Sequence, residues 1–181
     1  STVGTSTEIY DYLKLLFARI GKTYSPISNK EVKKDTVSDV INDIKTFAID
    51  SKWLLLSPIH LEEGRALEDK LKVLLQQGFA RILVDNEMVR LDTLDQHQLD
   101  NKDILLIIDR IVVKTEEEFF NRLADAVQTA FYEGKGVCYL QEVDTKKRLE
   151  YSANFELDGI TFLEPNIHLF SFNNTYGACP T

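Results

Sequence analysis

The sequence predicts an α+β fold, in which helices pack on a mostly antiparallel β-sheet, with a flanking helical stalk and an irregular C-terminal tail. Short apolar runs bounded by turn residues are typical of strands, and they occur at 53–56, 79–84, 88–91, 104–113, 137–143 and 148–152. Apolar residues at helical spacing occur between or before these runs, at 6–20, 36–48, 65–77 and 116–133. No internal repeat or low-complexity tract interrupts this pattern.

The first helix is well specified by its own residues. Thr5 and Glu8 have the spacing of a capping box, and Gly21 is expected to end the helix in the left-handed conformation. One face carries the apolar residues Ile9, Leu13, Leu16, Phe17 and Ile20. Because an exposed stripe of that size favours association, we expect this face to pack on the tail, on the central domain or on a second copy.

The next helix is predicted to begin after Thr36, which has Asp39 three positions on. A buried strand at 53–56 and a loop follow. The helix at 65–77 is expected to direct four leucines inward and to stop at Gly78. These leucines are Leu67, Leu71, Leu74 and Leu75.

The second half of the chain alternates strands with one long helix. Asp85 and Asn86 tolerate positive φ, which predicts a tight primed turn between two strands. The near-continuous apolar run at 104–113 predicts a central strand with both faces covered. Thr115 and Glu118 suggest a second capping box, and a last hairpin is expected across 144–147.

The charge and cysteine content restrict the function. The net charge of -8 and a pI near 4.9 disfavour strong binding to nucleic acid by this chain alone. No apolar run reaches the roughly 18 residues of a membrane span, and no signal-peptide pattern is present. Cys138 and Cys179 are too few for a disulfide framework, which favours a cytoplasmic location.

Two terminal motifs resemble those of the UvrA family, which belongs to the bacterial excinuclease. They are STVGTSTEIYDYLKLLFARIG at 1–21 and LFSFNNTYGACPT at 169–181. The region between these two motifs also matches the family, at Gln77-Gly78-Phe79, Asp85 and Asp109-Arg110. The resemblance implies an excised piece of a longer protein: a stalk helix at 1–30 from the signature region, a UvrB-interaction domain at 31–153 and a returning signature segment at 154–181.

The resemblance also implies partners. The expected partner is UvrB, and the parent UvrA is expected to be a homodimeric ABC-type ATPase of nucleotide excision repair that contacts damaged DNA outside this piece. The matching motif positions suggest Arg81, Asp85, Glu87 and Arg65 as contacts with UvrB. The competing interpretation is that Arg81 is a solvated strand residue and that Asp85 is only a turn former.

No cofactor is expected in this piece. It lacks a Walker-type phosphate loop, so ATP would bind elsewhere in the parent. Relatives commonly carry a four-cysteine zinc site, but the matching stretch at 154–159 has no cysteine, and Ser25 and Ser28 stand where many relatives have another. Cys179 alone cannot hold a structural zinc, so we expect none.

Two other functions compete with docking. Lys30, Lys33 and Lys34 form a local basic patch, which would suit a DNA-contacting module of the same ATPase. A small independent enzyme is disfavoured because no nucleophile, base or metal-ligand set is apparent, and His60, His97 and His168 lie far apart in the sequence.

Overall fold

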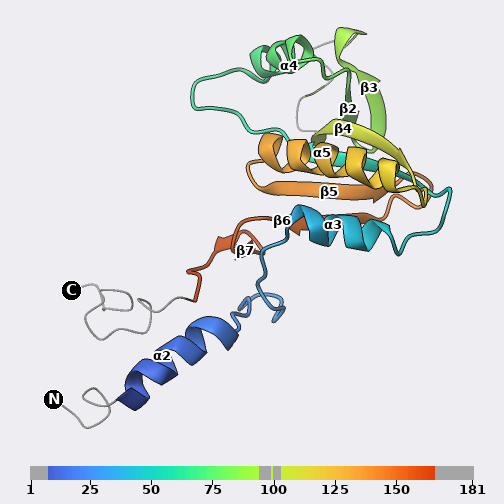
Figure 1. Ribbon diagram of the computed structural model, residues 1–181. Coiled ribbons are helices and arrows are strands. Elements are labelled where there is room, and N and C mark those ends of the chain that lie inside the picture. Colours follow the sequence, from blue (N-terminus) through green and yellow to red (C-terminus); the bar gives the residue numbers. More distant parts are fainter. Residues whose placement is uncertain (1–7, 94–98, 100–102, 166–181) are drawn as a thin grey trace. The chain divides into compact units, whose positions relative to one another are not determined.

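The structure is a computed structural model that describes residues 8–93, 99 and 103–165 (Figure 1). The chain divides into two compact units. One comprises Asp35–Asn154, and the other combines Ser1–Lys34 with Phe155–Thr181. The predicted α+β class is confirmed, because helices pack on a six-stranded sheet whose pairings are all antiparallel.

The sheet occupies the larger unit. Its order is β3-β2-β4-β1-β5-β6, so the apolar run at 104–113 is central, as predicted. The strands are β1 (Lys52–Pro58), β2 (Arg81–Val84), β3 (Glu87–Arg90), β4 (Ile104–Val112), β5 (Val137–Glu142) and β6 (Arg148–Ser152).

Three helices cover one face of this sheet: α3 (Val37–Ile44), α4 (Leu67–Gln76) and α5 (Glu117–Glu133). Helix α4 packs on β2 and β4, where it contacts Leu106. Leu106 is paired with Ser57 of β1, and the Ser57 hydroxyl donates to the carbonyl of Ala130 in α5 at 2.6 Å. Helices α4 and α5 therefore lie on the same face. The main core on this side includes Val40, Ile44, Leu55, Ile111, Leu123, Val127 and Leu140.

The opposite face is buried without a helix among the described residues. It holds a second apolar cluster of Leu54, Leu56, Leu83, Leu105 and Ile107. The amide of Gln141 on β5 donates to the Asn86 side chain in the β2–β3 turn at 3.1 Å. Strands β2 and β5 are three positions apart, which in a flat sheet means about 14 Å. The contact therefore requires a sheet that curls around this cluster.

The structure confirms the predicted helix cap, turns and helix end that depend only on residues close together in the sequence. Thr36 and Asp39 form a reciprocal capping box at α3. Asp85 and Asn86 have φ of 48° and 69° and join β2 to β3 in a two-residue turn. Gly78 has φ of 97° after α4. The hairpin of β5 and β6 also forms as predicted.

Three local predictions were wrong. Helix α5 begins later than expected, with Glu116 at the N-cap, so Thr115 lies outside the helix and forms no capping box. Leu75 is 41% exposed, because α4 contacts the sheet through Leu71 and Leu74 instead. Gly21 does not adopt positive φ; its N–H donates to the Phe17 carbonyl and continues the helical pattern. Thr5 lies outside the described residues.

The smaller unit contains helix α2 (Glu8–Ile20) and a two-stranded ribbon of β7 (Glu156–Leu157) and β8 (Ile160–Thr161). The predicted apolar face of α2 is exposed in this chain. Ile9 is 67% exposed and Phe17 is 50% exposed. The expectation that this face packs on the tail, on the central domain or on a second copy stays a prediction, because residues 166–181 of the tail lie outside the described residues. None of the described helices is long and apolar enough to span a membrane.

Adjacent leucines of α4 provide a test of the core. Leu74 is 1% exposed and Leu75 is 41% exposed. Replacing Leu74 with alanine should lower the free energy of unfolding by about 2–5 kcal/mol, because it leaves a cavity. The matched change Leu75→Ala should cost less than about 1 kcal/mol. Urea denaturation followed by Trp53 fluorescence measures both, and equal losses would contradict the packing of α4.

Candidate functional site

The β2–β3 hairpin carries three of the four predicted contact residues. Arg81 pairs with Arg90 at the open end of the hairpin, and Val84 pairs with Glu87 beside the turn. Asp85 and Glu87 therefore lie together at the turn, whereas Arg81 lies about 13 Å back along the strand. The structure thus places these charges along one hairpin at the edge of the sheet, where β2 is largely buried and the turn and β3 are exposed.

Asp85 has a structural task in the turn. Its N–H donates to the carbonyl of Asp103 at 3.0 Å, and its carboxylate accepts the N–H of Asp103 at 3.1 Å. These bonds fasten the turn to the chain that enters β4. They support the interpretation of Asp85 as a turn former, although the residue is exposed and open to a partner as well.

Arg81 and Glu87 have no such task. Arg81 is half-buried and Glu87 is exposed, and neither forms an ion pair within the part of the chain that the structure describes. The neighbouring Arg90 is bound instead to Asp92, whose carboxylate it contacts through Nε at 3.0 Å. This hydrogen bond lowers the pKa of Asp92. Arg81 also lines a groove of about 260 Å³ between residues 78–81 and residues 107–110 of β4.

Arg65 lies apart from the hairpin in the loop before α4. Its guanidinium contacts Glu62 at 3.4 Å, and both side chains are more than half exposed. Exposed pairs of this kind stabilise a fold little. No contact between described residues joins Arg65 to Arg81, Asp85 or Glu87, so the structure does not assemble the four candidates into one cluster.

A polar cluster that the sequence did not predict joins the turn of the β2–β3 hairpin to strands β5 and β6. Gln141 is only 1% exposed, and its amide bridges Asn86 and Arg148. Arg148 donates to Gln141 Oε1 at 2.9 Å and to the Asp103 carboxylate at 3.1 Å. Its guanidinium also lies 5.7 Å from the centre of the Tyr139 ring. The sequence did contain one signal for this cluster, since Gln141 stands in a largely apolar strand. A buried glutamine amide requires hydrogen-bond partners, so its position indicated a polar contact.

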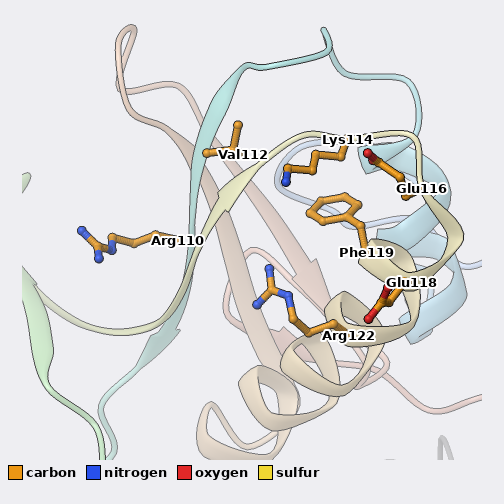
Figure 2. A pocket seen from close by; sticks show the side chains of 7 residues that line it. All are labelled: Arg110, Val112, Lys114, Glu116, Glu118, Phe119 and Arg122. Carbon is orange, nitrogen blue, oxygen red and sulfur yellow. The ribbon is translucent and has the colours of Figure 1, made fainter.

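A larger hollow lies where β4 leads into α5 (Figure 2). Its volume is about 610 Å³. Lys114, Phe119 and Arg122 gather at one side, whereas Arg110 points away across β4 (Figure 2). Arg122 contacts the Asp109 carboxylate at 2.7 Å. The hollow is lined by Arg110, Val112, Lys114, Glu116, Glu118, Phe119 and Arg122.

No metal-binding group of three or more histidine, cysteine or acidic residues occurs within the described ranges. Cys138 is buried in the core, and this burial raises the pKa of its thiol to about 12. The thiol is therefore protonated and is a poor ligand at neutral pH. Cys179 lies outside the described residues. His60 is within hydrogen-bonding distance of the Gly134 carbonyl, at 3.0 Å, which gives it a structural role.

Oxygen atoms hold the smaller unit together at Ser25, Ser28 and the stretch 154–159, positions that carry no cysteine in this sequence. The hydroxyls of Ser25 and Ser28 both donate to one carboxylate oxygen of Asp158, in the turn between β7 and β8. Ser25 is 1% exposed, and the loop around it is closed by its own backbone hydrogen bonds. We call Ser25, Ser28 and Asp158 the serine clasp.

The comparisons with known proteins agree on one family. A profile described as the UvrA interaction domain matches residues 35–144. The UvrABC system protein A of Methanothermobacter thermautotrophicus is 37% identical over 99% of this chain, and that of Neisseria gonorrhoeae is 36% identical over 100%. The Rickettsia felis protein of the same name is 34% identical over 99%. The chain spans only 19–20% of these relatives' length.

Replacing Gln141 tests the polar cluster. Gln141→Leu removes the bridge and leaves Asn86 and Arg148 without a buried partner, so it should lower the free energy of unfolding by about 1–3 kcal/mol. The exposed Gln128 of α5 offers a matched control, and Gln128→Leu should change stability by less than about 0.5 kcal/mol. Urea denaturation measures both variants. A neutral Gln141→Leu would show that the cluster does not hold the hairpin.

The serine clasp predicts a pH effect. Hydrogen bonds from Ser25 and then Ser28 lower the pKa of Asp158. The clasp therefore stabilises the unit above the ordinary aspartate pKa of about 3.9, and this contribution is lost as the pH falls through the lower folded pKa. An NMR titration of the Asp158 carboxyl carbon should show a midpoint below the ordinary value. The midpoint should rise in a Ser25→Ala/Ser28→Ala variant, and an unchanged midpoint would contradict the clasp.

Proposed function

The chain belongs to the UvrA family, and from this premise we propose that it is the part of a UvrA protein that docks UvrB in nucleotide excision repair. The observation that carries the proposal is that the matched interaction domain lies within one compact unit and begins at the same residue. The profile of the UvrA interaction domain covers residues 35–144, and the larger compact unit covers Asp35–Asn154. An interaction domain that is also a separate structural unit suits a role in docking.

The surface of the β2–β3 hairpin supports a charged interface. Arg81 and Glu87 form no ion pair with described residues, although Arg81 lies close enough to Asp92 to help lower the pKa of that carboxyl, so both side chains can contact a partner without first breaking an ion pair. Guanidinium groups bind carboxylates through two parallel hydrogen bonds and are common at interface centres. We therefore assign Arg81 the main contact and Glu87 a second one. Asp85 chiefly positions the turn, and Arg65 contributes at the margin.

The remaining activities are proposed for the longer parent protein. ATP binding, homodimer formation and contact with damaged DNA would be carried out by other parts of UvrA, because this chain has no Walker-type loop and is strongly acidic. The piece itself then acts by binding rather than by catalysis.

The alternative of a DNA-contacting module is weakened by the ion pairs of its basic patch. Lys33 contacts Glu31 at 3.8 Å, and Lys34 contacts Glu164. Lys22 reaches the same Glu31 carboxylate at 3.4 Å. These carboxylates offset much of the positive charge that would attract phosphate. We therefore favour protein docking over DNA contact.

Calorimetric titration of the purified chain with UvrB tests the proposal. We expect saturable binding at low salt that weakens as salt increases, because the interface is charged. Arg81→Glu should weaken binding at least tenfold, equivalent to about 1.4 kcal/mol. Arg65→Glu is the matched control and should weaken binding by less than about threefold.

Two outcomes would count against docking. Absence of both heat and co-elution with UvrB at low salt would refute it. A strong gel shift of damaged duplex by this chain, without binding to UvrB, would instead support the DNA-contacting alternative.

A further inference from the structure

Strand β4 has one edge that is only partly paired. On one side it pairs with β1 from Leu105 to Val112. On the other side it pairs with β2 only from Ile104 to Leu106. No described strand pairs with residues 107–112 on this side, and we call this stretch the open edge. Six residues of strand span about 20 Å, which is long enough to pair with another short strand.

The backbone orientation along the open edge follows from its neighbours. The N–H of Val113 donates to Ser51 at 3.0 Å, and the carbonyl of Val113 accepts from Asp50 at 2.9 Å. Val113 therefore directs its backbone groups toward the β1 side. Because this direction alternates along a strand, Arg110 and Val112 direct theirs toward the open side.

These outward groups are only partly satisfied. The N–H of Arg110 donates to the side chain of Asp109 at 2.8 Å. No hydrogen bond from a described residue on the open side reaches Val112, which is 41% exposed. A strand edge with such groups is a ready template for another chain.

Space for another chain exists on both halves of the open edge. The groove of about 260 Å³ adjoins residues 107–110, and the hollow of about 610 Å³ adjoins Arg110, Val112 and Lys114. Residues 78–81, which lead into β2, line the far side of the groove, so an added strand would pair mainly with residues 110–112 and direct side chains into the two spaces. Alternate side chains of the added strand would thus be recognised separately.

The charges beside the open edge select an acidic occupant. Arg110 and Lys114 are exposed and form no ion pair within the described ranges, although the whole chain carries a net charge of -8. Of the carboxylates nearby, Asp109 is bound to Arg122, and Glu116 accepts the N–H of Thr115. Glu118 also lines the hollow, from the first turn of α5. Phe119 lies between Lys114 and Arg122 in Figure 2, but its side chain is only 9% exposed and belongs to the core.

We propose that the open edge of β4 binds an extended acidic segment of a partner protein as an added β-strand. Backbone hydrogen bonds to Arg110 and Val112 hold the segment, and carboxylates of the segment contact Arg110 and Lys114. The site shares Arg81 with the contacts assigned to UvrB, since Arg81 lines the groove, but its binding rests on the backbone of β4. It is therefore tested without UvrB, so that its failure leaves the docking proposal standing.

The test uses a synthetic, end-capped nonapeptide that alternates glutamate and valine, titrated into the ¹⁵N-labelled chain. NMR should show saturable shifts of the Arg110 and Val112 amides, and hydrogen exchange at Val112 should slow at least about tenfold at saturation, because its N–H becomes bonded. A peptide of the same sequence with alternate backbone nitrogens methylated should not produce this protection, since it lacks the donors for pairing.

Charge variants complete the test. Arg110→Glu and Lys114→Glu should each weaken the acidic peptide about fivefold. Lys147→Glu, in the exposed turn between β5 and β6, is the matched control and should leave binding unchanged. The proposal is overturned if the methylated peptide binds equally well, if a lysine–valine peptide binds as tightly, if the shifts map to other strands, or if no peptide binds.

Discussion

The curl of the sheet depends on one buried amide. Gln141 joins Asn86 on one side and Arg148 on the other, and so connects strands that a flat sheet would keep apart. The curl encloses Leu54, Leu56 and Leu83 without a second layer of helices among the described residues. The fold therefore buries two apolar faces with helices on only one of them. Because buried polar groups lose free energy when a partner is missing, this bridge also specifies a single position for the β2–β3 hairpin.

That position determines which charges a partner protein can reach. The turn is tied down through Asp85 and Asn86, whereas Arg81 and Glu87 on the same hairpin form no ion pair with described residues. The hairpin therefore combines a rigid backbone with available side chains. Such preorganisation lowers the entropy that binding must overcome. The hairpin surface is suited to a partner that carries opposite charges facing Arg81 and Glu87. The affinity of the complex then depends on how well these charges complement one another.

Local chemistry predicted the elements of this fold well. The Asp85–Asn86 turn and the Thr36 cap follow from residues within four positions of one another. Tertiary contacts decided the rest. Leu75 fits the helical pattern, but α4 packs on the sheet through Leu71 and Leu74 instead. The bridge from Gln141 to Asn86 spans 55 positions, so no local pattern reveals it. Motif matching alone grouped Arg65 with the other candidates, whereas the structure puts it on a separate loop.

The serine clasp changes the conditions under which the smaller unit keeps its shape. Ser25, Ser28 and Asp158 hold their loops together through oxygen atoms alone. A thiolate–metal staple in the same role would fail when a chelator removes the ion or when an oxidant converts its sulfur atoms. Hydroxyl and carboxylate groups undergo neither reaction. This connection therefore depends neither on the supply of a metal ion nor on the redox state of a thiol.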